Sequence, residues 1–284
     1  MLVVDWLKKT ERDFIAANLY FGHGTDNAWD EAVALLRFVL KLPPDVDRSA
    51  LHLTVTPEDL AVLENLTFRR VHLKIPVPYL IQEAWFCGLP FYVDERVIIP
   101  RSPMAELIEK KFKPWIRDDH PLKILDLCAG SGCIGLAAAL AFPSSTVDLL
   151  ELSDDAIDVC KMNITKHHLD DRVQVLKSNL FSAVPDKKYD LIVSNPPYVD
   201  REDMRALPDE FRYEPTMALA AGEDGLVIVD SILKEFQSHL NPGGLLIVEV
   251  GNSDLALKRK YRDLPFVWLS FERGGSGVFL LNGS

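Results

Sequence analysis

Residues 123–135 read Lys-Ile-Leu-Asp-Leu-Cys-Ala-Gly-Ser-Gly-Cys-Ile-Gly. The apolar run at 123–127 predicts a buried strand, and the small residues at 132–141 predict a helix that packs closely on it. Glycines between the two elements let the backbone come close to a ligand. With a second apolar run at 146–152, this stretch forms a β-α-β unit, the building block of a parallel sheet covered by helices on both faces.

The same alternation continues toward the C-terminus. Further strands are expected at 173–177, 189–193 and 243–250, with helices at 154–168 and 225–240. Two final strands, 267–271 and 278–281, are joined by a glycine-rich turn and predict a terminal hairpin. We therefore expect an α/β fold for this half of the chain.

The N-terminal part has a different pattern. Apolar residues at helical spacing predict helices over 3–19, 29–40 and 57–73, the second capped by Asp26 or Asn27 and the third by Thr56. A β-hairpin is then expected over 83–99, with its turn at 88–90, followed by a helix from about residue 100 to Trp115. A small helical domain and a hairpin linker therefore precede the α/β domain.

Composition excludes several classes of protein. The chain has 284 residues, 48% of them hydrophobic, and a formal net charge of −11. No long run of Lys or Arg is present to follow a phosphate backbone, so we expect no direct binding to duplex DNA. The four cysteines form no C-x-x-C pair, which predicts reduced thiols and no metal site. No segment has the length or composition of a signal peptide or membrane span, so a cytoplasmic location is expected.

The first strand-to-helix turn predicts half of a ligand site. Gly130, Gly132 and Gly135 match G-x-G-x-x-G, with Ser131 between the first two, a pattern that also fits dinucleotide-binding loops. Asp126, four positions before the first glycine, favours a different ligand. Its carboxylate can meet the cationic amino-acid end of S-adenosylmethionine, whereas it would repel a pyrophosphate.

Two later strand ends add candidate cofactor contacts. Glu151 can accept hydrogen bonds from both ribose hydroxyls, which suits a nicotinamide cofactor as well as a methyl donor. Asn179 is placed to bond the edge of adenine, with Leu180 against the ring. An Asn at that position is equally consistent with an ordinary strand end.

The second half of the predicted site is Asn195-Pro196-Pro197-Tyr198, directly after a buried strand. Two consecutive prolines fix the backbone and remove two N–H donors, and the first keeps Asn195 out of helical geometry. What remains is a rigid edge of oxygen acceptors beside the Tyr198 ring. Such an edge suits a flat group that carries an NH2.

This edge decides between the two cofactor classes, because a dehydrogenase has no use for it. Loops at the carboxyl ends of parallel strands face one crevice, so a methyl donor in the glycine loop would meet an amino group at Asn195. Acceptance of the amide hydrogens by Asn195 and a proline carbonyl would stabilise the positive charge that develops on the attacking nitrogen. The long connection at 200–224 is expected to form a wall of the site.

These motifs, together with Arg212-Tyr-Glu-Pro215 and Gly222-Glu-Asp-Gly225, resemble those of the protein-glutamine methyltransferases that act on release factors or on a ribosomal protein. The segments 22–27, 84–88, 91–96 and 99–103 resemble the PrmB branch, which methylates a glutamine of large-subunit ribosomal protein number three. The sister HemK/PrmC branch acts on release factors.

The resemblance implies a seven-stranded, Rossmann-like class I methyltransferase domain with its last strand antiparallel. It implies a substrate-recognition domain at 1–80, a hairpin linker at 81–102 and a methyltransferase domain at 103–284. It also implies a site: Asn195, Pro196, Pro197 and Tyr198 would hold the glutamine amide, while Asp126, Gly130, Ser131, Gly132, Glu151, Asn179, Leu180 and Asn195 would contact S-adenosylmethionine, which leaves as S-adenosylhomocysteine. Two positions depart from the pattern: Asn179 replaces a frequent acid, and Glu151 a frequent Asp.

Three alternatives remain open at this point. Methylation of a release factor shares all of the chemistry and differs only in the N-terminal segments. Methylation of adenine in DNA also uses an Asn-Pro-Pro-Tyr edge, but the net charge and the lack of a target-recognition insert oppose it. The third is a non-catalytic assembly factor that binds a ribosomal protein. The partner is expected to be the ribosomal protein, free or in an assembling particle.

Overall fold

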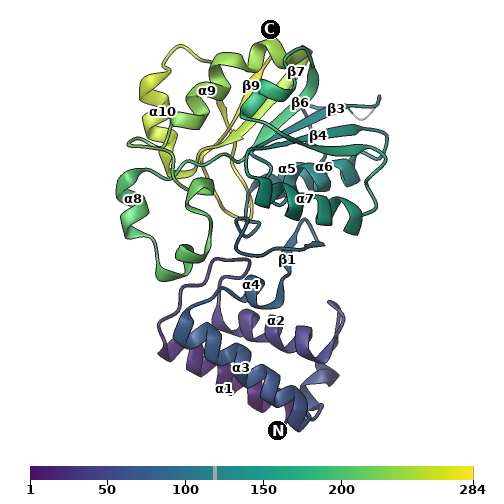
Figure 1. The fold of residues 1–284 in the computed structure, drawn as a ribbon, viewed down its shortest axis with the longest axis vertical. Coiled ribbons are helices and arrows are strands. Elements are labelled where there is room, and N and C mark those ends of the chain that lie inside the picture. The colour runs from purple at the N-terminus through teal and green to yellow at the C-terminus, as the bar shows by residue number, and fades with distance from the viewer. Residues whose placement is uncertain (118–119, 284) are drawn as a thin grey trace. The chain divides into compact units, whose positions relative to one another are not determined.

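A computed structural model of the chain describes residues 1–117 and 120–283 (Figure 1). The chain divides into two compact units. The first, here the helical unit, comprises Met1–Ala84 together with Pro208–Tyr213. The second, here the α/β unit, comprises Trp85–Leu207 and Glu214–Ser284. These bounds differ from the expected 1–80, 81–102 and 103–284, because the hairpin belongs with the sheet and a short later segment belongs with the helices.

The helical unit is built from amphipathic helices. Its α-helices are α1 (Val3–Ala16), α2 (Ala28–Leu40), α3 (Pro57–Leu73) and the short α4 (Val77–Ile81), with a 3₁₀ turn at Arg48–His52. The Asn27 side chain caps α2 by accepting from the backbone N–H of Asp30, and Thr56 caps α3 by accepting from Asp59. Helices α1, α2 and α3 lie side by side, purple to blue in Figure 1. The predicted helices of this part are confirmed to within three residues.

The segment Pro208–Tyr213 is held in the helical unit by a buried arginine. Arg70 of α3 is 0% exposed, and its Nε lies 2.7 Å from Oε2 of Glu31. Its Nη1 lies 3.1 Å from Oε1 of Glu210, which also accepts the backbone N–H of Tyr20. One guanidinium therefore joins two helices to a segment about 140 residues later in the chain.

The α/β unit contains a seven-stranded sheet. Its strand order is β5-β4-β3-β6-β7-β9-β8. Strands β3 to β7 pair in parallel, and β9 pairs antiparallel with both neighbours, as predicted. The strands are β3 (Lys123–Leu127), β4 (Thr146–Glu151), β5 (Val173–Lys177), β6 (Tyr189–Ser194), β7 (Leu240–Glu249), β8 (Val267–Trp268) and β9 (Val278–Asn282).

Helices cover both faces of this sheet, as Figure 1 shows. One hydrophobic core contains residues of α5 (Met104–Glu109), α6 (Cys133–Ala141) and α7 (Asp154–Lys166). The other contains residues of α9 (Val227–Glu235) and α10 (Asp254–Lys260). The α/β class with a seven-stranded Rossmann-like sheet is therefore confirmed.

Three local predictions were wrong. The hairpin consists only of β1 (Ala84–Phe86) and β2 (Leu89–Phe91), with its turn at Cys87-Gly88, and the chain from 92 to 99 is not a strand. Helix α5 ends at Glu109, well before Trp115, because Lys111 and Phe112 adopt positive φ and Pro114 cannot continue a helix. The helix expected at 225–240 is α9 followed by a 3₁₀ turn at Phe236–His239.

The connection from β6 to α9 contains the short helix α8 (Arg201–Ala206) and two 3₁₀ turns, Asp209–Tyr213 and Thr216–Ala218. Within the described ranges 1–117 and 120–283, no helix combines the length and the apolar character that crossing a membrane requires.

Candidate active site

The two halves of the predicted site begin on neighbouring strands. Leu127, the last residue of β3, is in register with Ser194, the last residue of β6. The Ser194 hydroxyl donates a 2.8 Å hydrogen bond to the Leu127 carbonyl and joins the two strand ends. The glycine loop after β3 and the Asn-Pro-Pro-Tyr segment after β6 therefore start at the same edge of the sheet.

The three glycines of the motif have two functions between them. Gly130 has φ +56°, and a Cβ built on it would meet no heavy atom within 4 Å. At Gly132 a Cβ would lie 2.8 Å from Sγ of Cys160, and at Gly135 it would lie 2.2 Å from Cδ2 of Leu149. Gly132 and Gly135 thus permit close packing of α6, whereas Gly130 leaves open space for a ligand beside the backbone.

Glu151, the last residue of β4, fixes this loop. Its Oε2 accepts the backbone N–H of Gly130 at 2.8 Å. Its Oε1 accepts those of Leu152 at 2.7 Å and Ser153 at 2.9 Å. The carboxylate therefore connects the ends of two strands and is oriented before any ligand arrives.

Asp126 lies deeper than the sequence suggested. It is 1% exposed, and its Oδ2 accepts the backbone N–H of Gly135 at 2.8 Å. Burial raises the pKa of Asp126 to about 7. The structure thus gives this side chain a direct contact with the start of α6.

A cavity of about 120 Å³ opens above these strand ends. Six of the residues predicted to contact cofactor or substrate line it: Gly130, Glu151, Asn179, Leu180, Asn195 and Pro197. Asp126, Ser131 and Gly132 are not among its lining residues. The motif positions at four strand ends thus come together. Five residues of the predicted set lie outside the lining: these three together with Pro196 and Tyr198.

The connection 200–224 forms part of the wall of this cavity, as predicted, through Pro215, Met217 and Ala218. The chain after the hairpin contributes Arg96, Val97 and Ile98, which the sequence did not predict as wall residues. Leu152, which follows Glu151, also lines the cavity and is 48% exposed. An apolar residue next to a strand-end acid was a usable signal for Leu152, whereas Arg96, Val97 and Ile98 lie in an irregular segment.

Asn195 lines a second cavity as well. This one, of about 30 Å³, is formed by Asn195, Pro196 and Tyr198 together with Ile98, Arg101 and Leu219, among others. Within the described part of the α/β unit, Asn195 and the neighbouring Ile98 and Ala218 are therefore common to both cavities. The rigid acceptor edge predicted from the sequence separates the larger cavity from the smaller one.

Arg101 lines the smaller cavity and is held by a buried carboxylate. Nη1 and Nη2 of its guanidinium bond Oε1 and Oε2 of Glu214, with Nη2 at 2.6 Å from Oε2. Glu214 is 3% exposed and also accepts the backbone N–H of Ile99 at 2.9 Å. This pair fixes the chain before α5 to the residue that precedes Pro215, a wall residue of the larger cavity.

The cysteines offer no ready nucleophile. All four are free, and burial raises the pKa of the Cys133 thiol to about 12 and that of Cys87 likewise. Burial also raises the pKa of Cys128, which lines the larger cavity. At neutral pH these thiols stay protonated and act as small apolar groups.

The chain is similar to known methyltransferases. Residues 112–222 match the family model described as "Methyltransferase small domain". A protein of Francisella tularensis named "Ribosomal protein uL3 glutamine methyltransferase" is 46% identical over 98% of this chain and 88% of its own length. A protein of the same name from Bordetella pertussis is 44% identical over 94% of this chain and 90% of its own.

Solved structures support the fold. The hMettl16 catalytic domain superimposes with a TM-score of 0.54 at 16% identity, over 87% of this chain and 91% of that one. A methyltransferase from Pyrococcus furiosus gives a TM-score of 0.50 at 17% identity, over 81% of this chain and 100% of that one. At these identities the likeness concerns the architecture of the chain.

Proposed function

The chain belongs to the family of ribosomal protein uL3 glutamine methyltransferases, and we propose that it transfers a methyl group from S-adenosylmethionine to the side-chain amide nitrogen of a glutamine in uL3. The observation that carries this proposal is the position of Asn195, which lines both cavities. A methyl donor in one cavity and an amide in the other would meet at this residue.

Several features of the larger cavity support binding of S-adenosylmethionine. The open space beside Gly130 admits a ligand against the backbone, and Glu151 offers carboxylate oxygens for the ribose hydroxyls. Asn179 is proposed to bond the adenine edge, with Leu180 against the ring. When bound, S-adenosylmethionine supplies an electrophilic methyl group on a positively charged sulfur with a good leaving group.

Asp126 is proposed to act together with Ser131 and Gly132 at the amino-acid end of the methyl donor, as the motif predicts. Asp126 also accepts the Gly135 N–H and so fixes the start of α6 after the glycine loop. This hydrogen bond supports an indirect contribution of Asp126 to cofactor binding, through the position of the loop. The direct contact remains a prediction.

The Asn-Pro-Pro-Tyr edge orients the amide. The side-chain oxygen of Asn195 and the carbonyl of a proline would accept the two amide hydrogens, so that the nitrogen lone pair points toward the larger cavity. These acceptors stabilise the positive charge that the nitrogen gains as it attacks. The N–CH3 bond forms as the S–CH3 bond breaks and S-adenosylhomocysteine leaves. The N-methylated amide cation is strongly acidic and releases its extra proton to water, so no strong base is needed. The Tyr198 ring would cover the flat face of the amide.

Recognition of the partner is proposed for the helical unit. Ribosomal proteins carry positive charge to neutralise RNA phosphates, and this chain has a net charge of −11, which favours their encounter. The helical unit has its own groove between α1 and α3, lined by Trp6, Leu60 and Phe68, among others. A cytoplasmic location, where ribosomal proteins are made and assembled, remains a prediction.

The decisive experiment is methyl transfer from labelled S-adenosylmethionine to purified uL3 and to a release factor, offered separately, with the modified residue identified by mass spectrometry. An assembling large-subunit particle forms a further arm, to be compared with free uL3. We expect label on one glutamine of uL3 and none on the release factor.

Asn195→Ala is expected to lower the rate of methyl transfer by at least about 100-fold, because enzymes lose about this much when one group that stabilises developing charge is removed. Asn282→Ala, an exposed residue at the end of β9, is the matched control and should behave as the wild type. Label on the release factor alone would assign the sister activity. No label on either, with Asn195→Ala still supporting subunit assembly, would favour the non-catalytic assembly factor.

A further inference from the structure

Tyr198, at the edge of the smaller cavity, is held by three separate contacts. Its hydroxyl donates a 3.1 Å hydrogen bond to Oε1 of Glu249, and its carbonyl accepts the Ser253 hydroxyl at 2.9 Å. Its ring lies against Gly251, where a Cβ would come within 2.5 Å of the ring atom Cε2. The ring that is proposed to cover the amide therefore has little freedom to rotate away.

Glu249 is a buried carboxyl group that the proposed chemistry does not use. It is the last residue of β7 and is 5% exposed. Its Oε2 accepts the Ser102 hydroxyl at 2.6 Å, while Oε1 accepts Tyr198. Burial raises the pKa of Glu249 to about 7, although the hydrogen bonds from Ser102 and Tyr198 and the charge of Arg101 each lower it. Burial of a carboxyl group costs free energy unless the group is hydrogen-bonded, so a buried Glu249 indicates a specific contact, here with Ser102 and Tyr198.

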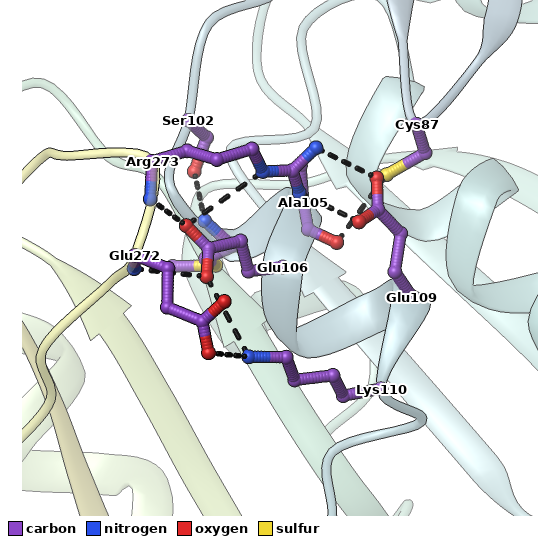
Figure 2. Close-up of polar contacts among 9 residues, drawn as sticks. Cys87, Ser102, Ala105, Glu106, Glu109, Lys110, Glu272 and Arg273 are labelled. Carbon is purple, nitrogen blue, oxygen red and sulfur yellow. Dashed lines mark hydrogen bonds and ion pairs between the residues drawn. The ribbon is translucent and has the colours of Figure 1, made fainter.

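Ser102 is fixed in turn by the start of α5. Its hydroxyl accepts the backbone N–H of Met104 at 3.1 Å. One turn later, Glu106 accepts the backbone N–H groups of Glu272 at 3.1 Å and Arg273 at 2.7 Å (Figure 2). Arg273 also bonds Glu109, with Nη1 at 3.2 Å from Oε1 and Nη2 at 2.6 Å from Oε2. Figure 2 shows the guanidinium directed at this carboxylate.

The segment that Glu106 holds at Glu272 and Arg273 continues to Gly277, which packs beside Gly251 under the Tyr198 ring. The Gly277 carbonyl accepts the backbone N–H of Val250 at 2.7 Å. A Cβ on Gly277 would lie 2.1 Å from the Gly251 carbonyl oxygen, so the two backbones are in close contact. Helix α5 thus holds both the Ser102 hydroxyl at Glu249 and the chain that supports Gly251.

We propose that Glu249 is a positioning residue for the methyl transfer: its carboxyl group, held by Ser102, fixes the Tyr198 ring at the smaller cavity so that the acceptor amide is oriented toward Asn195. This inference rests on the proposed function, whose acceptor cavity it extends. Glu249 acts through Tyr198 and lines neither of the two cavities.

The test compares Glu249→Leu, Glu249→Gln and Tyr198→Phe in the full chain, with uL3 as the methyl acceptor. Glu249→Leu is expected to lower kcat at least about 10-fold, which corresponds to a loss of about 1.4 kcal/mol of transition-state stabilisation. The KM for S-adenosylmethionine should change less than about twofold. Glu249→Gln should keep most of the activity, because an amide oxygen can still accept from the tyrosine hydroxyl.

A double variant separates positioning from an independent effect. If Glu249 acts through the tyrosine hydroxyl, Tyr198→Phe with Glu249→Leu should be no slower than Tyr198→Phe alone. Losses that multiply in the double variant would overturn the proposal, as would a wild-type kcat in Glu249→Leu. Ser102→Ala, with exposed Ser238→Ala as its control, gives a milder arm should Glu249→Leu fold poorly.

A spectroscopic arm does not depend on activity. In protein labelled with carbon-13 at the tyrosine Cζ, Tyr198→Phe assigns the Tyr198 signal. We expect that signal to move in Glu249→Leu and to stay close to the wild type in Ser238→Ala. A wild-type enzyme that methylates no glutamine would defeat the proposed function, whereas an unmoved Tyr198 signal would defeat the positioning role alone.

Discussion

The backbone N–H of Gly130 donates a 2.8 Å hydrogen bond to Oε2 of Glu151. One residue lies in the glycine loop after β3 and the other at the end of β4. A single contact thus unites the two features from which the sequence predicted cofactor binding. The acid has two functions here, since it shapes the loop and also faces the larger cavity.

Glu151→Ala is expected to weaken binding of S-adenosylmethionine more than a lost ribose contact would, because the Gly130 N–H loses its acceptor as well. We expect Kd to rise at least about 30-fold, about 2 kcal/mol. Isothermal titration calorimetry measures it, with exposed Glu235→Ala on α9 as the control. Binding within threefold of the wild type would contradict this assignment.

Gly130→Ala tests the open space beside the loop. Gly130 and Gly243 both have positive φ, +56° and +76°, and neither has a heavy atom within 4 Å of a built Cβ. Alanine at either position should cost a similar amount of stability, about 1 kcal/mol, through backbone strain. Only Gly130→Ala is expected to lose cofactor binding, because Gly243 lies outside the larger cavity. Equal Kd values for the two variants would show that the loop does not approach the ligand.

Much of the α/β unit could be predicted because its signals are local. Each buried strand is an apolar run, and parallel order brings successive strand ends to one edge, so Gly130, Glu151, Asn179 and Asn195 could be placed together from the sequence. The roles of Glu249 and Ser102 could not be found this way. Ser102 and Glu249 lie 147 residues apart in the sequence, and no local pattern links them.

The same limit applies to the walls and the unit boundaries. Arg96, Val97 and Ile98 lie in an irregular segment, which has no period to recognise. The wall formed by the connection 200–224 could be predicted as a segment, because of its length, but not residue by residue. The return of Pro208–Tyr213 to the helical unit depends on Arg70 and Glu210, which are 140 residues apart. Asp126 was identified by its position in the motif, but its depth depends on how closely α6 packs.

Asp126→Asn is expected to change how stability depends on pH. The folded carboxyl has a pKa of about 7, whereas an ordinary aspartate has a pKa of 3.8, so the folded state holds a proton that the unfolded state releases. The stabilisation that the Asp126 carboxyl contributes to the folded state is fully present below about pH 4 and is lost as pH rises through 7. The free energy of unfolding of the wild type should therefore fall relative to Asp126→Asn between pH 5 and 7, by up to about 1.4 kcal/mol per pH unit, and run parallel above pH 8.

Urea unfolding at four pH values gives this comparison, with Asp155→Asn in the exposed first turn of α7 as the control. Asparagine keeps an oxygen to accept the Gly135 N–H, so the fold should persist. A pH-independent difference between wild type and variant would show that Asp126 is ionised across the range.

Arg70→Met tests the buried ion cluster of the helical unit. The variant leaves the carboxyl groups of Glu31 and Glu210 buried without their cation, and such a loss costs about 3–5 kcal/mol. Lys9→Met, in an exposed pair with Asp13, should cost less than about 0.5 kcal/mol. Thermal unfolding compares the two variants, and similar small shifts in Tm for both would contradict the importance of the cluster.

Phe68→Ser tests whether the helical unit recognises uL3. Phe68 on α3 is 55% exposed and lines the groove between α1 and α3, where a partner's apolar side chain would be removed from water. Loss of such a contact costs about 1.5–3 kcal/mol, so KM for uL3 should rise at least about 10-fold. The Kd of S-adenosylmethionine should not change, because the cofactor cavity lies in the α/β unit. Leu255→Ser, at a side chain of α10 that is 60% exposed, is the matched control. An unchanged KM in Phe68→Ser, or an equal rise in both variants, would place recognition elsewhere on the chain.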